Sequence, residues 1–255
     1  VTIDDFTFRS VTTDLFGHGS VVFDPEAIEI EAVVTSDVTD LTRLFPDYEP
    51  ARAPDLISAE EAKSVVPAKD REKVFSDEPL PLKFLRTADI DISFQPKKFV
   101  TPYGVFENVN LRVVLEEDAL NVRPLEARYA DSDLRGDFSL DARGQTPLVG
   151  LSLRSPDIQI GQLFKDFANL DVLEGSGAID IALSGSGNSI AAIAGSLDGH
   201  ARQLMGKGRM RNEGLGYVSG LFSGIGEALG GKSWVAVDCM ANDFEFKDGV
   251  ATSRV

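Results

Sequence analysis

The chain has 255 residues, of which 43% are hydrophobic and 26% charged, and its formal net charge is −16. That length allows one large domain or two smaller ones. The acidity disfavours nucleic acid as a partner, because phosphate backbones are bound through Lys and Arg, and it disfavours electrostatic docking on anionic lipid surfaces. A single cysteine, Cys239, excludes an internal disulfide and a CxxC site.

Residues 1–46 are predicted to form a first β block that ends in a short helix. Phe6 and Phe8 alternate with polar residues, as do the apolar residues of Ile28–Ala32. The apolar spacing then lengthens, and Ser36 or Asp37 could cap a helix over Asp37–Phe45. Its apolar face would hold Val38, Leu41, Leu44 and Phe45.

Residues 47–83 read as a surface connection. Prolines recur through this stretch, and Glu, Lys and Ala fill most of the space between them. Low hydrophobicity and repeated prolines are typical of a connection rather than of a packed element.

Residues 84–255 are dominated by strands with one apolar and one polar face. Apolar and polar residues alternate through Ala88–Gln95, and the alternation returns in Val109–Val113, Leu134–Ala142 and Val149–Arg154. A sheet covered on both faces would show continuous apolar runs instead. The pattern therefore predicts a mainly β protein, an elongated and curved antiparallel sheet with a few short helices.

Turns and one bulge are also predicted within this sheet. Glu117-Asp118 should form a turn between two strands. Near Pro124 the apolar phase shifts by one residue, which indicates a β-bulge that bends the sheet.

A second helix is expected over Asp157–Phe167, again after a strand. The spacing from Ser155 to Phe164 matches that from Ser36 to Phe45. This match suggests a weak internal repeat of several strands closed by one helix, which would extend the molecule by stacking.

The last third is rich in glycine. Gly185–Ser189 is interpreted as a hairpin turn, and a strand with few large side chains is expected over Ile193–Ala201. Glu213–Gly230 has apolar residues at helical spacing, with a helix predicted within Glu213–Leu229. Three roles stay open for it: a helix packed on the sheet, a mobile lid on the apolar face, or a membrane-surface helix.

No catalytic or metal-binding motif is present. His18 and His200 are the only histidines, and neither lies in a nucleophile or metal motif. His200 falls on the polar phase of its strand and is expected at the solvated surface, whereas Cys239 falls on an apolar phase and is expected in the core. The prediction is a protein that is not an enzyme and has no cofactor and no metal.

Several sequence segments resemble the C-terminal region of AsmA-family proteins. They are Phe75–Leu82, Leu85–Asp91, Leu115–Leu125, Leu134–Gly136, Leu183–Ser189, Leu197–Gly199 and, most specifically, Cys239–Ala251. Gly206–Arg209 departs from the family, which more often has an Asn-Gly turn there. The resemblance covers residues 74–251, and the first block is compatible with it.

This resemblance implies a periplasmic protein of Gram-negative type that takes part in outer-membrane biogenesis. It implies tethering to the inner membrane by an N-terminal transmembrane helix that lies outside this chain. The chain itself is expected to be truncated at both ends. The larger relatives are similar to bridge-like lipid transfer proteins, whose curved sheets form a hydrophobic groove.

Two functions follow as hypotheses. In the first, the apolar face of the sheet binds phospholipid or another acyl lipid. Its predicted lining is Ile90, Ile92, Phe94, Leu111, Val113, Phe138 and Leu140. In the second, helices from Asp157 and Glu213 cover that face, and the protein is an assembly factor that acts on envelope proteins through its edges or its acidic surface.

Overall fold

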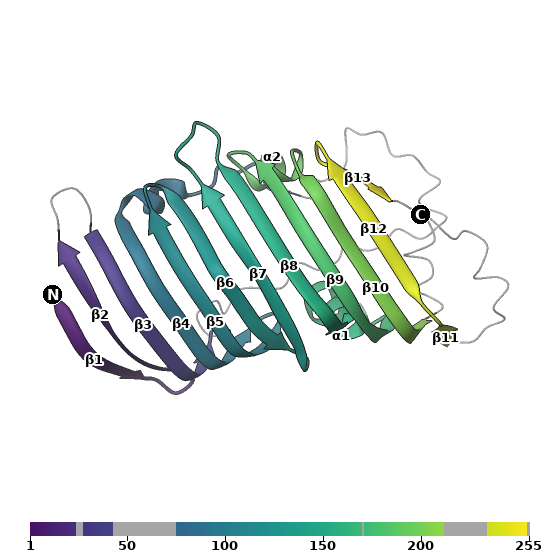
Figure 1. The fold of residues 1–255 in the computed structure, drawn as a ribbon, viewed down its shortest axis with the longest axis horizontal. Helices are drawn as coiled ribbons and strands as arrows, with labels where there is room; N and C mark the ends of the chain where they lie inside the picture. Colours follow the sequence, from purple (N-terminus) through teal and green to yellow (C-terminus); the bar gives the residue numbers. More distant parts are fainter. Residues whose placement is uncertain (24–27, 43–74, 170, 212–233, 254–255) are drawn as a thin grey trace.

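The computed structural model describes residues 1–23, 28–42, 75–169, 171–211 and 234–253. Thirteen strands in these ranges form one sheet, which is long, open and curved (Figure 1). Its first half contains β1 (Thr2–Arg9), β2 (Asp14–Phe23), β3 (Ile28–Asp40), β4 (Ala88–Thr101), β5 (Gly104–Glu116), β6 (Ala119–Tyr129) and β7 (Ser132–Asp141). Its second half contains β8 (Leu148–Gln159), β9 (Leu173–Ser186), β10 (Asp198–Arg211), β11 (Trp234–Val237), β12 (Met240–Lys247) and β13 (Val250–Ser253).

The strands follow one another across the sheet nearly in chain order. β10 pairs with β12 along most of its length and with β11 at its end. Neighbours are antiparallel except β3 and β4, which run parallel from Ile28 opposite Ala88 to Asp40 opposite Val100. The prediction of an elongated, curved, mainly antiparallel sheet is confirmed.

Two-residue turns connect β5 to β6 and β6 to β7. Glu117 and Asp118 have φ values of 47° and 63°, and Ala130 and Asp131 have 47° and 65°. Positive φ at both central residues is the geometry that matches the twist of a tight hairpin. The predicted turn at Glu117-Asp118 is confirmed.

The predicted bulge near Pro124 is present. The register between β6 and β7 shifts between Val122 and Leu125, and the register of β6 with β5 shifts beside it. The shift lets Val122 and Leu125 lie in rows of the same face although three positions separate them.

The described helices are short and lie at the two ends of the strands (Figure 1). The 3-10 helix η2 (Leu82–Arg86) and α2 (Ile190–Ala194) lie at one end, and α1 (Ile160–Ala168) lies at the other. The helix expected over Asp157–Phe167 is therefore present but begins at Ile160. Gln159 is still paired with Ser176 of β9, so the chain stays extended until that point.

The helix expected from Asp37 is wrong for the residues that the structure describes. Residues up to Asp40 extend β3, where Val38 pairs with Lys98 of β4. A carboxylate oxygen of Asp14 accepts the backbone N–H groups of Asp37 and Val38, at 2.9 and 3.0 Å. These bonds and the parallel pairing hold an extended chain, so the helical half of the supposed repeat is absent there. Leu44 and Phe45 lie outside the described residues.

Two predictions near β10 are also corrected. Gly185–Ser189 is not a hairpin turn, because Ser189 caps α2 by accepting the N–H of Ala192 at 3.1 Å. Ile193 lies within α2 and Gly195 at its end, so the strand begins only at Asp198.

Cys239 is exposed between β11 and β12, not in the core, because β11 ends at Val237 before the apolar phase reaches it. The Glu213–Leu229 helix lies outside the described residues.

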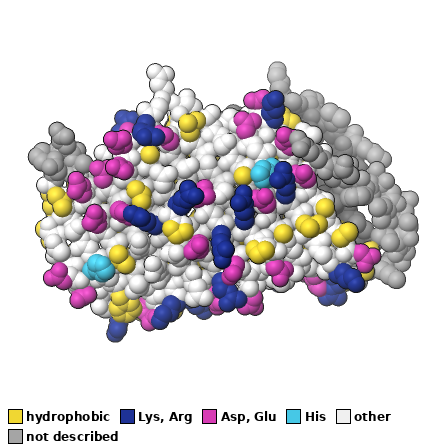
Figure 2. All heavy atoms as spheres, in the orientation of Figure 1, with side chains coloured by type: hydrophobic (Ala, Val, Ile, Leu, Met, Phe, Trp, Pro, Cys, Tyr) yellow, Lys and Arg dark blue, Asp and Glu magenta, His cyan; other side chains and the backbone are white. Residues whose placement is uncertain are grey.

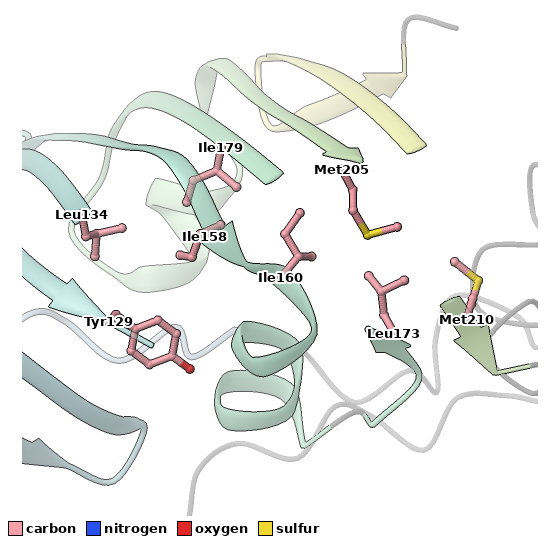
Figure 3. Close-up of a cluster of buried hydrophobic side chains, with 8 residues drawn as sticks. All are labelled: Tyr129, Leu134, Ile158, Ile160, Leu173, Ile179, Met205 and Met210. Carbon is pink, nitrogen blue, oxygen red and sulfur yellow. The ribbon is translucent and has the colours of Figure 1, made fainter. Parts of the chain in front are cut away.

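Buried side chains gather in two clusters, one at each end of the strands. Figure 3 shows the larger one, between α1 and the sheet, which contains Tyr129, Leu134, Ile158, Ile160, Leu173, Ile179, Met205 and Met210. The smaller one lies under η2 and contains Leu85, Leu115, Leu140 and Ala142. The middle of the face between them holds side chains that are mostly half-buried.

Candidate functional site

One face of the sheet carries continuous apolar rows that cross the strands. Residues directly opposite each other in a ladder point to the same face, so the registers define the rows. We call the two central rows the apolar band. Its first row is Ala32, Ile92, Val113, Val122, Phe138, Leu151 and Leu183. Its second row is Val34, Phe94, Leu111, Leu125, Gly136, Leu153 and Ile181.

The structure brings all seven predicted lining residues to this face. Ile92, Val113 and Phe138 lie in the first row of the band, and Phe94 and Leu111 lie in the second. Ile90 and Leu140 belong to the neighbouring row, which runs from Ile90 through Leu115 and Leu120 to Leu140.

The seven residues differ in how much of each is covered. Six are half-buried, whereas Leu140 is 9% exposed and packs in the cluster under η2. Ile90 and Phe138 also contact that cluster. Within the band, Leu151 is 37% exposed. The band is therefore partly open, and the row nearest η2 is the more covered one.

Several band residues were missed from the sequence, among them Val122, Leu125, Leu151 and Ile181. Leu151 could have been found, since it shares the alternation of Val149 and Leu153. Val122 and Leu125 could not be assigned to one face without the position of the bulge, because each extra residue reverses the phase.

η2 closes one side of the band. Leu85 is 2% exposed and packs with Leu115, Leu140 and Ala142. The backbone of the preceding segment is fixed as well, because the N–H of Leu80 donates to the carbonyl of Asn188 at 2.8 Å.

α1 closes the other side of the band through Tyr129. The Tyr129 hydroxyl donates to Oδ2 of Asp166 at 2.6 Å, and burial raises the pKa of this phenol, helped by the Asp166 carboxylate. Phe167 stacks on Tyr103 with ring centroids 5.2 Å apart and meets the Tyr129 ring edge to face at 6.1 Å. Helical segments thus flank the band on both sides.

The opposite face is polar and charged. Figure 2 shows it, with acidic and basic side chains interspersed and both histidines visible. One row crosses it through Asn110, Glu126, Arg135, Arg154, Asp180, Arg202 and Asp243. Nε of Arg154 donates to Asp180 at 2.9 Å, and Nε of Arg202 donates to Asp243 at 3.2 Å. His200 lies on this face with Nε2 3.6 Å from Asp180, half-buried rather than solvated.

The hollows that the structure shows lie mainly on the polar face and at the strand ends. A hollow of about 510 Å³ lies over β1–β5 beside His18, Glu31 and Arg112, and one of about 480 Å³ lies over β6–β8. Within the described ranges, no three His, Cys, Asp or Glu side chains gather as metal ligands would. No described helix has the length and apolar character needed to cross a membrane.

The chain matches the model of the AsmA family over residues 22–255. This protein belongs to the AsmA family. It is 25% identical over 171 residues to the AsmA family protein YhjG of Escherichia coli (strain K12). That alignment covers 66% of this chain but only 25% of the relative, so the chain spans about a quarter of the relative's length. No solved structure matches the chain.

AsmA family membership confirms the resemblance seen in the sequence. It also supports a role related to the cell envelope at the level of the family, whose members are envelope-associated and are not known as enzymes. The apolar band is the feature of this AsmA-family chain that best fits such a role.

Proposed function

We propose that this AsmA-family chain is a non-catalytic module that binds the acyl chains of phospholipids, or of another acyl lipid, along its apolar band. In the same proposal it acts in the periplasm, tethered to the inner membrane through a transmembrane segment of the full-length protein, and serves outer-membrane biogenesis. The AsmA membership supports the envelope part of this proposal.

The observation that carries the proposal is the continuity of the band across the sheet. Rows of apolar residues run perpendicular to the strands from β3 to β9, and helical segments flank them on both sides. An extended acyl chain needs a long apolar strip of this kind, and each buried methylene contributes about 0.8 kcal/mol. A few methylenes in contact therefore suffice for binding.

The partial exposure of the band supports the same reading. A sealed core would leave its central side chains almost inaccessible, as Leu85 and Ile158 are at 2% and 1%. Leu151 in the first row of the band retains 37% of its surface instead. Apolar surface left accessible in a continuous strip is typical of binding surfaces.

The test compares two neighbouring residues of β4 that point to opposite faces. Ile92→Asp places a carboxylate in the band, and Ser93→Asp places the same charge on the polar face. We expect Ile92→Asp to fold and to lose co-purified phospholipid in native mass spectrometry, while Ser93→Asp keeps it. A half-buried position tolerates the charge because water reaches it once the lipid has left.

Photo-crosslinking in cells adds an independent readout. A photoreactive amino acid at Ile92 should form lipid adducts, and the same group at Ser93 should not. If Ile92→Asp unfolds the chain and the crosslinks reach only the protein itself, lipid binding by the band is rejected.

The second hypothesis, an assembly factor with a covered face, is supported by the two helical segments. Leu85 of η2 and Ile160 of α1 are buried against the ends of the strands, so part of the face is already occupied. Envelope proteins would then be bound at the edges or on the polar face. This alternative predicts that Ile92→Asp unfolds the chain, because it buries an unpaired carboxylate, whereas Ser93→Asp keeps the fold and weakens the function in cells.

A further inference from the structure

A second candidate site lies on the polar face, where β6, β7 and β8 lie side by side. The hollow there measures about 480 Å³. Three arginines from three strands line it: Arg123, Arg135 and Arg154. Its remaining lining is Pro124, Glu126, Asp133, Gly136, Asp137, Ser152 and Pro156.

Two of these arginines stand directly opposite each other. Arg135 of β7 pairs in register with Arg154 of β8, and like charges in directly opposite positions destabilise a sheet. Arg154 donates through Nε to Asp180 at 2.9 Å, whereas Arg135 forms no ion pair with any residue that the structure describes. Glu126 of β6 is opposite Arg135 on the other side, and no described carboxylate lies within ion-pair distance of the Arg135 guanidinium group.

The third arginine is placed by the bulge. The register between β6 and β7 slips between Val122 and Leu125, and Arg123 lies in that slip. Bulges redirect side chains and recur beside functional sites. Arg123 also forms no ion pair within the described ranges, so two guanidinium groups of the hollow are uncommitted.

The acidic residues around the hollow are engaged elsewhere. Asp137 accepts a hydrogen bond from the Ser152 hydroxyl at 2.7 Å, and Glu126 accepts one from the Asn110 amide at 2.9 Å. Asp133 lies 3.7 Å from Nε of Arg128, an arginine outside the hollow. These carboxylates keep their negative charges, but each has another side chain as its partner, and none of them is within ion-pair distance of Arg123 or Arg135.

We propose that this hollow binds a phosphate group, in the form of a phosphate monoester or free phosphate. A phosphate dianion would give Arg123 and Arg135 the anionic partner that they lack. It would also reduce the repulsion between Arg135 and Arg154. Guanidinium groups bind phosphate oxygens through paired N–H donors, which gives short, charge-assisted hydrogen bonds. The site lies on the face opposite the apolar band, so it does not depend on the function proposed above.

The test measures the affinity of the protein for inorganic phosphate by ³¹P NMR titration at constant ionic strength. The variant is the double substitution Arg123→Gln and Arg135→Gln. Its control is Arg112→Gln with Arg202→Gln, which removes the same charge from two paired arginines of the same face. We expect the affinity to fall at least about tenfold in the variant and to stay within about twofold of the wild type in the control.

A parallel titration with glycerol 3-phosphate separates two sources of the phosphate. Equal affinities would identify a site for the phosphate group alone, and tighter binding of glycerol 3-phosphate would identify a lipid headgroup or a similar ester. Added phosphate should also raise the melting temperature of the wild type and of the control but not that of the variant. Binding that is undetectable in the wild type, or that weakens equally in variant and control, would overturn the proposal.

Discussion

The Tyr129 hydroxyl donates to Oδ2 of Asp166 at 2.6 Å and thereby ties the last residue of β6 to the last turn of α1. The Tyr129 hydroxyl oxygen also lies 3.2 Å from the backbone carbonyl oxygen of Gln162, one turn earlier in the helix. Tyr129 is only 2% exposed, so this link joins a buried strand end to a helix that flanks the apolar band.

Removing the Tyr129 hydroxyl should break this hydrogen bond without leaving a cavity in the buried cluster. Tyr129→Phe keeps the ring and its contact with Phe167 but removes the donor to Oδ2 of Asp166. We expect the free energy of unfolding to fall by about 1–2 kcal/mol, measured by urea denaturation. Gln162→Ala, which removes an exposed bond to the same carboxylate, serves as the control and should cost less than about 0.5 kcal/mol.

The same residue predicts a pH dependence in alkali. Burial first, and then the Asp166 carboxylate, raise the pKa of Tyr129 above its ordinary value of 10.0. A raised pKa in the folded state means that the stabilisation is fully present below about pH 10 and is lost as the pH rises toward the folded-state value. The stability difference between wild type and Tyr129→Phe should therefore shrink above pH 10, and a difference that stays constant there would contradict the assignment.

Gly177 allows β9 and β10 to approach closely. A Cβ built on it would lie 1.9 Å from the carbonyl oxygen of Leu204 and 2.7 Å from Cα of Met205. Because both are backbone atoms, Gly177→Ala must push the strands apart, at a cost of about 3 kcal/mol.

Gly206 provides the matched control for Gly177 on the neighbouring strand. Among the described residues, nothing lies within 4 Å of a Cβ built there. Gly206→Ala should change the stability by less than about 0.5 kcal/mol. Equal melting temperatures for Gly177→Ala and Gly206→Ala would show that stability does not depend on the close approach of the strands at Gly177.

Leu85 should stabilise the η2 side of the band. Its side chain is 2% exposed and packs against Leu115 and Leu140. Leu85→Ala should lower the free energy of unfolding by roughly 3 kcal/mol, because it leaves a cavity between η2 and the sheet. Lys83→Ala, an exposed change in the same short helix, should have little effect in the same denaturation experiment. A loss below about 1 kcal/mol for Leu85→Ala would indicate that η2 is not packed in solution as described.

The strands were predictable because side-chain alternation is set by the sheet itself. Ile90, Ile92 and Phe94 alternate in the sequence and lie on one face in the structure, as do Leu111 and Val113. The turn at Glu117-Asp118 and the bulge at Pro124 were predictable too, since each leaves a local signature in residue type or phase.

The predictions that were wrong concerned segments whose structure depends on contacts with residues distant in the sequence. The spacing of Val38 and Leu41 suited a helix, but Asp14 binds the backbone there and β4 pairs beside it. Tertiary contacts of this kind override local propensity. Ile193, Gly195 and Leu197 alternate by coincidence, and the cap at Ser189 was the signal for a helix instead.

The candidate site was predicted in outline only. The apolar face and its seven residues could be named from alternation, but the covering of Leu140 by Leu85 could not, because these residues are distant in sequence. The arginine pair Arg135 and Arg154 was also out of reach, since it exists only through the register of β7 with β8.

The parallel junction between β3 and β4 has a consequence for the order of folding. The connections between successive strands from β4 to β10 are much shorter than the one between β3 and β4, even where α1 or α2 lies within them, so each antiparallel pair can form early. Ile28 must instead find Ala88 across the longest loop that closes any pairing of neighbours in the sheet. Loop closure of that length is slow, so β1–β3 should join last and, in pulsed hydrogen exchange, acquire protection after the strands from β4 onward.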